Sequence, residues 1–276
     1  MKKSNRELHR RILTGVIGGF ALLGLLIFGG WIGIFVFTTG LTMGMIYEFS
    51  EITFSMPDKV EKRNILFLMV WFIELINLIA RHIEFPLLIF SFLFLFTYYL
   101  LTARRYTDAQ LSLHIRELMY SLFGLVYLCF IPLYFSRIYE TAHGVEWIVL
   151  FFLIVFAGDT GAYFAGMKFG EHKLYPSISP KKTVEGAIGG IISGVVITLF
   201  AKLVFFKSLH WSSILLFPLF VGPVAQIGDL CESFLKRSFD RKDSGSILPG
   251  HGGFLDRFDG VVFSLPVMYA CIQLLG

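Results

Sequence analysis

Charged residues are scarce in this chain. Asp, Glu, Lys and Arg make up 16% of its 276 residues, whereas soluble domains carry about 25%. So few charges argue against an ordinary soluble domain, because they leave much of the surface apolar. Hydrophobic residues reach 55%, and 31 residues are Phe, a side chain that suits acyl chains and needs no hydrogen-bond partner. The composition therefore indicates that lipid surrounds most of the protein.

The chain has only three cysteines, and it has no segment with the composition of a linker between domains. Cys129, Cys231 and Cys271 lack the spacing of metal ligands, which argues against a cysteine-based metal site. No internal repeat and no Pro- or Ser-rich linker divides the chain. We therefore expect a single membrane domain over residues 1–276, with a plain part (1–150) followed by a part that carries the chemistry (151–276).

Long apolar runs recur along the whole chain, and a helix that crosses a bilayer needs about 20 mostly apolar residues. The sequence predicts an all-α, polytopic integral membrane protein with about nine transmembrane helices. The expected spans lie near residues 12–28, 31–48, 64–80, 84–102, 118–136, 146–167, 185–206, 211–233 and 260–275.

The basic residues support this topology. If the N-terminus is cytoplasmic, the segments 1–11, 49–63, 103–117, 168–184 and 234–259 lie inside and hold 20 of the 24 Lys and Arg residues. Cytoplasmic loops are expected to carry such an excess. We thus predict a multi-pass protein of a cell (inner) membrane, with its N-terminus and active site facing the cytoplasm. The net charge of +4 reflects this bias, and we expect no nucleic-acid partner.

Small residues recur every fourth position in two of the later spans. They are Ala157, Gly161 and Ala165, and then Gly186, Gly190 and Gly194. Such faces let helices approach closely, so they predict tight helix packing in the C-terminal half.

The densest polar stretch runs from Gly228 to Gly260. Asp229 and Glu232 are three residues apart, as are Asp256 and Asp259, and this spacing puts each pair on one helix face. Both pairs lie at the end of an expected span, so they converge if the two helices are neighbours. Carboxylate oxygens suit Mg²⁺, which binds through one or two carboxylates and substrate phosphates.

Cations and glycines fill the sequence between these acidic pairs. Carboxylates that bind a metal ion, basic side chains and a glycine-rich loop are typical of sites for phosphoryl-type chemistry. Each feature alone has a simpler interpretation, since a basic loop also sets topology or touches anionic lipid. The stretch contains Lys236, Arg237, Arg241, Lys242, Gly245, Gly250, His251, Gly252, Gly253 and Arg257.

A second basic loop precedes the span at 185–206 and is expected on the same side of the membrane. The N-terminus of the following helix favours anions. Hydroxyl and ammonium groups suited to phosphate oxygens come from Ser177, Ser179, Lys181, Lys182 and Thr183.

These segments resemble a known family. The run Ser233–Arg237, then Lys242 and Asp243, then Pro249–Asp259 is similar to the signature of phosphatidate cytidylyltransferases (CDP-diacylglycerol synthases). The segment Ser179–Gly186 resembles a second motif of that family. The specific motifs lie between residues 150 and 260, and the N-terminal half adds no identification.

The resemblance implies that a phosphatidate oxygen attacks the α-phosphorus of CTP, so that pyrophosphate leaves and CDP-diacylglycerol forms. The implied partners are CTP, phosphatidate and membrane lipid, with Mg²⁺ acting alone or with a second cation. A homodimer is compatible with the resemblance and with the glycine-faced helices.

The resemblance also implies roles for single residues. Asp229 and Asp256 are the expected primary metal ligands, with Asp259, Glu232 and Asp159 as further ligands or their neighbours. The expected contacts to substrate phosphates come from Lys236, Arg237, Lys242, Arg257, Ser179, Lys181, Lys182, Thr183, Gly252 and Gly253. His251 either donates to a phosphate oxygen or the leaving pyrophosphate, or serves only as a residue of a turn.

Two other classes of protein stay open. One is a different lipid-linked enzyme that uses a nucleotide, such as a polyprenol or dolichol kinase acting with CTP; a CDP-alcohol phosphatidyltransferase fits less well because its motif is not found. The other is a transporter or lipid scramblase, which the acids within spans, Glu74 and Asp159, would favour. The lack of repeated halves and the polar residues gathered in loops argue against transport.

Overall fold

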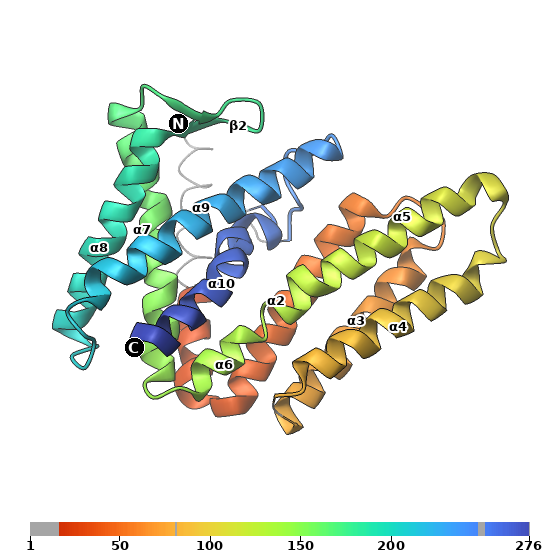
Figure 1. The fold of residues 1–276 in the computed structure, drawn as a ribbon, viewed down its shortest axis with the longest axis horizontal. Coiled ribbons are helices and arrows are strands. Elements are labelled where there is room, and N and C mark those ends of the chain that lie inside the picture. Colours follow the sequence, from red (N-terminus) through yellow and green to blue (C-terminus); the bar gives the residue numbers. More distant parts are fainter. Residues whose placement is uncertain (1–16, 81, 248–251, 276) are drawn as a thin grey trace. The chain divides into compact units, whose positions relative to one another are not determined.

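Helices make up most of the protein. The computed structural model describes residues 17–80, 82–247 and 252–275, and Figure 1 shows their fold. In this part of the chain, seven helical segments are long and apolar enough to cross a membrane. The prediction of an all-α, polytopic membrane protein is therefore confirmed.

The count of nine spans is not confirmed. The described part of the first expected span is a shorter apolar helix, Ile17–Phe28. The third expected span, 64–80, corresponds to α3 (Lys59–Ile79), which begins five residues earlier and has charged side chains at four of its first five positions. Neither helix is among the seven. Ile17–Phe28 is short, and the uncharged part of α3 is too short to cross a membrane.

The described residues form two compact units. The first takes in those of Met1–Leu133 together with Asp243–Leu255, and the second takes in Tyr134–Lys242 and those of Asp256–Gly276. Besides Ile17–Phe28, the first unit contains α2 (Gly30–Thr53), α3, α4 (Glu84–Ala103), α5 (Asp108–Leu125) and a π-helical turn, η1 (Val126–Phe130). Within this unit α2 packs on α3, and α4 packs on α5.

A buried ion pair holds one end of the first unit together. The ammonium nitrogen of Lys62 lies 2.6 Å from Glu117 and 3.0 Å from Asp58, and the Lys62 side chain is completely buried. The Tyr106 hydroxyl donates to Asp58. These contacts bring the loop between α2 and α3 to the loop between α4 and α5. The two segments 49–63 and 103–117 thus share one end of the unit, as the predicted topology requires.

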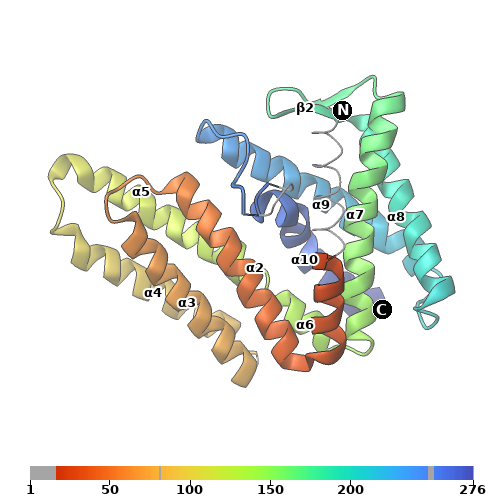
Figure 2. The ribbon, with the colours of Figure 1, turned by 180° about the vertical axis from the view of Figure 1, so that it is seen from behind.

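The second unit contains five helices and a β-hairpin among the described residues. In chain order they are α6 (Tyr134–Glu140), α7 (Gly144–Phe169), β1 (Lys173–Tyr175), β2 (Ser179–Thr183), α8 (Val184–Val204), α9 (Ser213–Ser238) and α10 (Leu255–Leu275). Figures 1 and 2 show α7 and α8 side by side, with α9 crossing α8. The hairpin stands where α7 ends and α8 begins.

Small residues make the contact between α7 and α8 possible. A Cβ on Gly190 would lie 2.9 Å from the Gly158 carbonyl oxygen, and a Cβ on Gly161 would collide with Ser193. Side chains at these positions would force the helices apart, because packed interiors tolerate little added volume. The predicted tight packing in the C-terminal half is thus confirmed, but the α7 residues that lie against Gly186 and Gly190 are Gly158, Ala162 and Gly166. This packing fixes where α7 and the β2–α8 junction stand in the site described next.

Candidate active site

A polar pocket lies within the second unit. Its volume is about 620 Å³, and its walls come from α7, the β-hairpin, the start of α8, the C-terminal half of α9 and the first turns of α10. This size is typical of sites that bind small molecules. The predicted neighbourhood of the loop at 168–184 and the acidic helix ends is therefore realised in one cavity.

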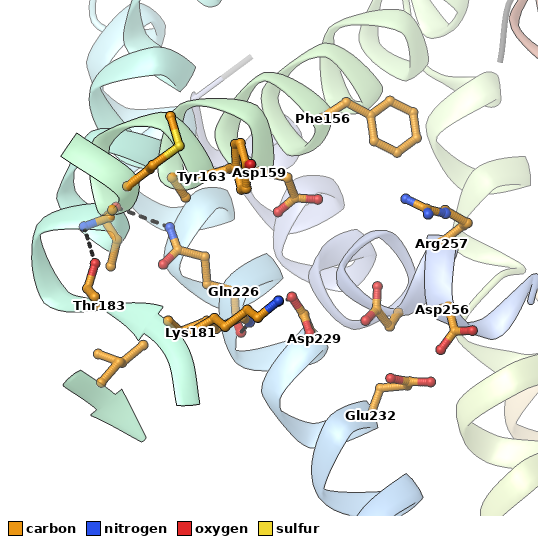
Figure 3. Close-up of a pocket in the computed structure, with 18 of the residues that line it drawn as sticks. Phe156, Asp159, Tyr163, Lys181, Thr183, Gln226, Asp229, Glu232, Asp256 and Arg257 are labelled. Atoms are coloured by element: carbon orange, nitrogen blue, oxygen red, sulfur yellow. Dashed lines mark hydrogen bonds and ion pairs between the residues drawn. The ribbon is translucent and has the colours of Figure 1, made fainter. Parts of the chain in front are cut away.

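Helical periodicity turns the acidic side chains into this pocket. On α9, Asp229 and Glu232 lie three residues apart and Lys236 follows after four, so all three share a face. On α10, Asp256 and Asp259 do the same. Figure 3 shows Asp159 of α7, Asp229 and Glu232 of α9, and Asp256 of α10 directed toward a common space.

Lys182 connects the hairpin to α9. Its ammonium nitrogen lies 2.7 Å from the Asp229 carboxylate and also donates to the Gln226 carbonyl oxygen at 3.3 Å. The Ser233 hydroxyl donates to the other Asp229 oxygen at 3.4 Å. The first expected metal ligand is thus held by a basic residue of the second expected motif.

Lys236 makes a similar connection between α9 and α10. Its ammonium nitrogen lies 2.5 Å from Glu232 and 2.5 Å from Asp256. The Glu232 side chain is 1% exposed, so this cluster is largely shielded from solvent and its charges attract strongly. Removing one member of a buried cluster leaves an uncompensated charge. Lys236 therefore ties the two acidic helix faces together.

Local hydrogen bonds fix the basic loop. The Thr183 side chain caps α8 by accepting from the Gly186 amide at 3.1 Å, as Thr does at helix N-termini. Glu185, in the first turn of α8, accepts hydrogen bonds from residues just before β1. Its donors are His172 Nδ1 at 2.6 Å and the backbone amides of Glu171 and His172. Lys181 and Lys182 thus lie on β2 just before a junction with α8 that these hydrogen bonds hold in place.

One wall of the pocket is apolar, and the sequence did not indicate it. Phe156, Tyr163 and Met167 of α7 line the cavity with Leu174 of the hairpin. The three α7 residues lie on the same helical stripe as Asp159, at spacings of three or four residues. That spacing is the signal that would have found them. The pocket therefore offers a charged wall and an apolar wall.

Most predicted site residues line the pocket. They are Asp159, Lys181, Lys182, Thr183, Asp229, Glu232, Lys236, Asp256, Arg257 and Asp259. Gln226, one turn before Asp229, also lines it and was not predicted; its side-chain amide donates to the Ala187 carbonyl oxygen at 3.1 Å.

The remaining predicted residues lie elsewhere in the described chain or outside it. Arg237 follows Lys236 directly, so it points about 100° away around α9, and its guanidinium donates to the Arg241 carbonyl oxygen. Lys242 is exposed beyond the end of α9, and Ser179 at the start of β2 is outside the pocket lining. Gly252 and Gly253 belong to the first unit. His251 lies outside the described residues.

The pocket's donor set suits a hard cation. Carboxylate oxygens are the usual protein ligands of Mg²⁺. Glu232 Oε1 is buried without a hydrogen-bond partner, while Oε2 pairs with Lys236 at 2.5 Å. Over the ranges 17–80, 82–247 and 252–275, no three acidic, His or Cys side chains approach closely enough to form a complete metal site. The residues present thus fit a cation that shares its coordination with phosphate oxygens.

Fold and site together define a polytopic membrane protein with a pocket in which carboxylates face lysines. A more specific assignment comes from comparison with known proteins. The model of the cytidylyltransferase family matches residues 9–275, and the chain belongs to this family.

Named relatives support this membership. A phosphatidate cytidylyltransferase of Bacillus subtilis (strain 168) is 33% identical over 276 residues, covering 97% of this chain and 98% of the relative. One from Staphylococcus aureus (strain COL) is 34% identical over 273 residues, covering 94% and 96%. One from Staphylococcus saprophyticus is 45% identical over 148 residues, covering 53% and 56%. Similarity therefore extends over nearly the whole chain.

Proposed function

We infer that the protein is a phosphatidate cytidylyltransferase, a nucleotidyltransferase that makes CDP-diacylglycerol and pyrophosphate from CTP and phosphatidate. Family membership over residues 9–275 supports this reaction, as do full-length relatives that bear this name. The structural observation that carries it is the pocket, where lysines and carboxylates from β2, α7, α9 and α10 meet beside an apolar wall.

The reaction forms one bond and breaks one. A phosphate oxygen of phosphatidate attacks the α-phosphorus of CTP, and the bond from that phosphorus to the oxygen bridging toward the β-phosphate breaks. The nucleophile is already an anion, so no strong general base is needed. The difficulty is to bring two polyanions together, and this calls for positive charge and fixed orientation. In this chain Lys181, Lys182, Lys236 and Arg257 supply the charge.

Two lysines of the pocket are paired with carboxylates in the structure. Lys182 pairs with Asp229, and Lys236 pairs with Asp256 and Glu232. Phosphate oxygens that enter the pocket compete with these carboxylates for the same ammonium groups. The carboxylates orient the lysines before substrate binds, which lowers the cost of ordering them on binding.

Asp229 and Asp256 would hold Mg²⁺, with Asp259, Glu232 and Asp159 as further ligands or as partners of the ligands. A cation bound there would neutralise negative charge on the phosphate oxygens. Their placement on three helices around one cavity supports this role.

The two walls of the pocket match the two ends of a lipid phosphate. The phosphate group of phosphatidate would face the lysines, while the glycerol and the start of the acyl chains would lie along Phe156, Tyr163 and Met167. We propose that this pocket opens on the cytoplasmic side of a cell (inner) membrane, with the N-terminus on that side, because the basic loops cluster there in the topology. Membrane lipid as a partner, and a homodimer, complete the proposal.

The competing functions are less well supported. Glu74, which would favour a transporter, is buried in the first unit and accepts a hydrogen bond from Thr38 at 3.0 Å, so it has a structural role there. A lipid kinase that uses CTP remains the sharper alternative, because it would also require lysines and a cation.

Pyrophosphate release tests the proposal. The purified protein in detergent is given CTP and Mg²⁺, with and without phosphatidate. We expect release only when phosphatidate is present, together with a CDP-lipid. Formation of CDP and a newly phosphorylated lipid would instead indicate a kinase, and untouched CTP from folded protein would contradict the proposal.

A further inference from the structure

A buried carboxylate lies far from the pocket residues in sequence, in a span that the sequence shows as plain. Glu48 of α2 is 1% exposed. Its Oε2 atom accepts a hydrogen bond from the Ser244 hydroxyl at 2.8 Å, across 196 residues of sequence, and another from the Leu255 amide at 3.0 Å. A buried carboxylate needs such partners, and here both come from the segment 244–255 of the same compact unit.

Two glycines of this segment allow the close approach. A Cβ on Gly245 would lie 2.5 Å from Glu48 Oε1, and a Cβ on Gly253 would collide with the Glu48 carboxylate and with Ser244 Oγ. Any side chain at either position would displace the carboxylate. Glu48 thus fits between the two ends of the segment, with Ser244 and Gly245 at one end and Gly253 and Leu255 at the other.

The hydrogen bond from the Leu255 amide to Glu48 lies at the start of α10. Leu255 is the first residue of α10, and the next residue in the chain is Asp256, which pairs with Lys236 in the pocket. The first amides of a helix have no partner within the helix, and a negative charge near them is favourable. The Glu48 carboxylate satisfies one of these amides from another helix.

We propose that Glu48 is a positioning residue for the reaction. It links Ser244 to Leu255 and fixes the first turn of α10, and through that turn it sets where Asp256 stands. Glu48 does not touch substrate in this account. The inference rests on the proposed function, because it gives Asp256 a role in turnover.

Variants at Glu48 separate positioning from mere stabilisation. Glu48→Ala removes the acceptor of both hydrogen bonds, whereas Glu48→Gln keeps an oxygen that can accept them. Displacement of a catalytic group by about 1 Å can lower turnover about 100-fold, so we expect kcat of Glu48→Ala to fall by about this factor. The KM for CTP should stay within about 3-fold, because the lost interaction acts on turnover. Glu48→Gln should recover at least about 10-fold of the lost kcat, because its amide oxygen can still accept.

A matched control lies one turn along the same helix. Glu51 pairs with Lys59 and Arg63, and its side chain is 36% exposed. Exposed ion pairs contribute little, so Glu51→Gln should keep the kcat of the unmodified protein. Ser244→Ala provides a second test, since it removes one of the two donors and leaves Glu48 in place. It should lower kcat in the same direction as Glu48→Ala.

Hydrogen exchange measured by mass spectrometry gives a readout that does not depend on activity. In Glu48→Ala, or in Ser244→Ala and Glu48→Gln if the alanine variant does not fold, exchange should rise in peptides covering 244–258 and stay unchanged in α3 and α4. Unchanged kcat in Glu48→Ala or Ser244→Ala would overturn the inference, and so would exchange that rises equally along the whole chain. If the unmodified protein makes no CDP-lipid, the proposed function fails, while the exchange data still decide whether Glu48 holds the segment.

Discussion

Lys182 of the β-hairpin reaches α9, where its ammonium nitrogen lies 2.7 Å from the Asp229 carboxylate. Lys182 belongs to the motif Ser179–Gly186, and Asp229 lies four residues before the longer motif begins at Ser233, so that 46 residues of chain separate the two. Their contact joins a basic strand to an acidic helix face. The site thus contains lysine–carboxylate pairs, and we propose that these pairs separate when phosphate groups enter.

The carboxylates should be essential for turnover. Asp229→Asn and Asp256→Asn keep the shape of the side chain and remove its charge, so we expect kcat to fall by about 100-fold or more, as when an electrostatic contact to the transition state is lost. Initial rates in detergent measure the effect. Asp240→Asn is a matched control, because Asp240 is exposed just beyond α9 with a positive φ of 54° that Asn also tolerates. Normal rates in either site variant would exclude the metal-ligand role.

Lys181 and Lys182 should differ in their kinetic effects. Lys181 lines the pocket and has no ion pair among the residues that the structure describes, so Lys181→Ala should raise the KM for CTP about 10-fold by removing a charged contact. Lys182→Ala also deprives Asp229 of its partner, so it should lower kcat as well. Steady-state kinetics distinguish the two. Lys173→Ala, on the exposed strand β1, should match the unmodified protein, and equal effects of all three would argue against a site at β2.

The contact between α7 and α8 should not tolerate added volume. Gly190→Val places a Cβ 2.9 Å from the Gly158 carbonyl oxygen and from Gln226 Nε2, so we expect the free energy of unfolding to fall by about 1–3 kcal/mol. Thermal unfolding in detergent provides the measurement. Gly40→Ala is the control, since a Cβ there meets nothing within 4 Å. A Tm for Gly190→Val equal to that of the control would contradict the packing.

Asp58 should make stability depend on pH at the acidic end. Burial alone would raise the pKa of Asp58, but hydrogen bonds from Tyr106 and Lys62 outweigh it and hold the pKa below its usual value. A carboxyl whose folded-state pKa is depressed stabilises the fold above its unfolded pKa, and this contribution is lost as the pH falls through the folded-state pKa.

Asp58→Asn should therefore lower the free energy of unfolding at pH 7 by about 1–2 kcal/mol, through weaker hydrogen bonds. The difference from the unmodified protein should shrink below about pH 4, where an unperturbed Asp becomes protonated. Thermal unfolding across this pH range checks the sign. A difference that stays constant down to pH 3 would show that the Asp58 charge does not stabilise the fold.

Much of the fold followed from hydropathy, but helix ends did not. The expected span 211–233 corresponds to α9, Ser213–Ser238, because the helix continues past the end of the apolar run. This extension carries Lys236 into the pocket. Hydropathy detects burial in lipid, whereas a helix ends where its hydrogen bonding ends. For the same reason α3 was taken as a membrane span, although its first turns are charged.

The site was predictable where the signal is local in sequence. The spacings of Asp229 with Glu232 and of Asp256 with Asp259 placed these residues correctly on shared helix faces. Arg237 was grouped with Lys236 by proximity in sequence, but adjacent residues of a helix point in different directions. Glu48 was missed because its partners lie about 200 residues away in the chain, and no periodicity within one helix reports such a contact.

The position of a radioactive label in the product distinguishes cytidylyl transfer from phosphorylation of a lipid. The purified protein in detergent, with phosphatidate and Mg²⁺, is given CTP labelled either at the α-phosphate or at the γ-phosphate, and the lipid fraction is counted. We expect the α-label to enter the lipid and the γ-label to leave in pyrophosphate, and we expect Asp256→Asn to transfer neither. Entry of the γ-label into lipid would show phosphorylation by a kinase, and folded protein that transfers no label at all would contradict cytidylyl transfer.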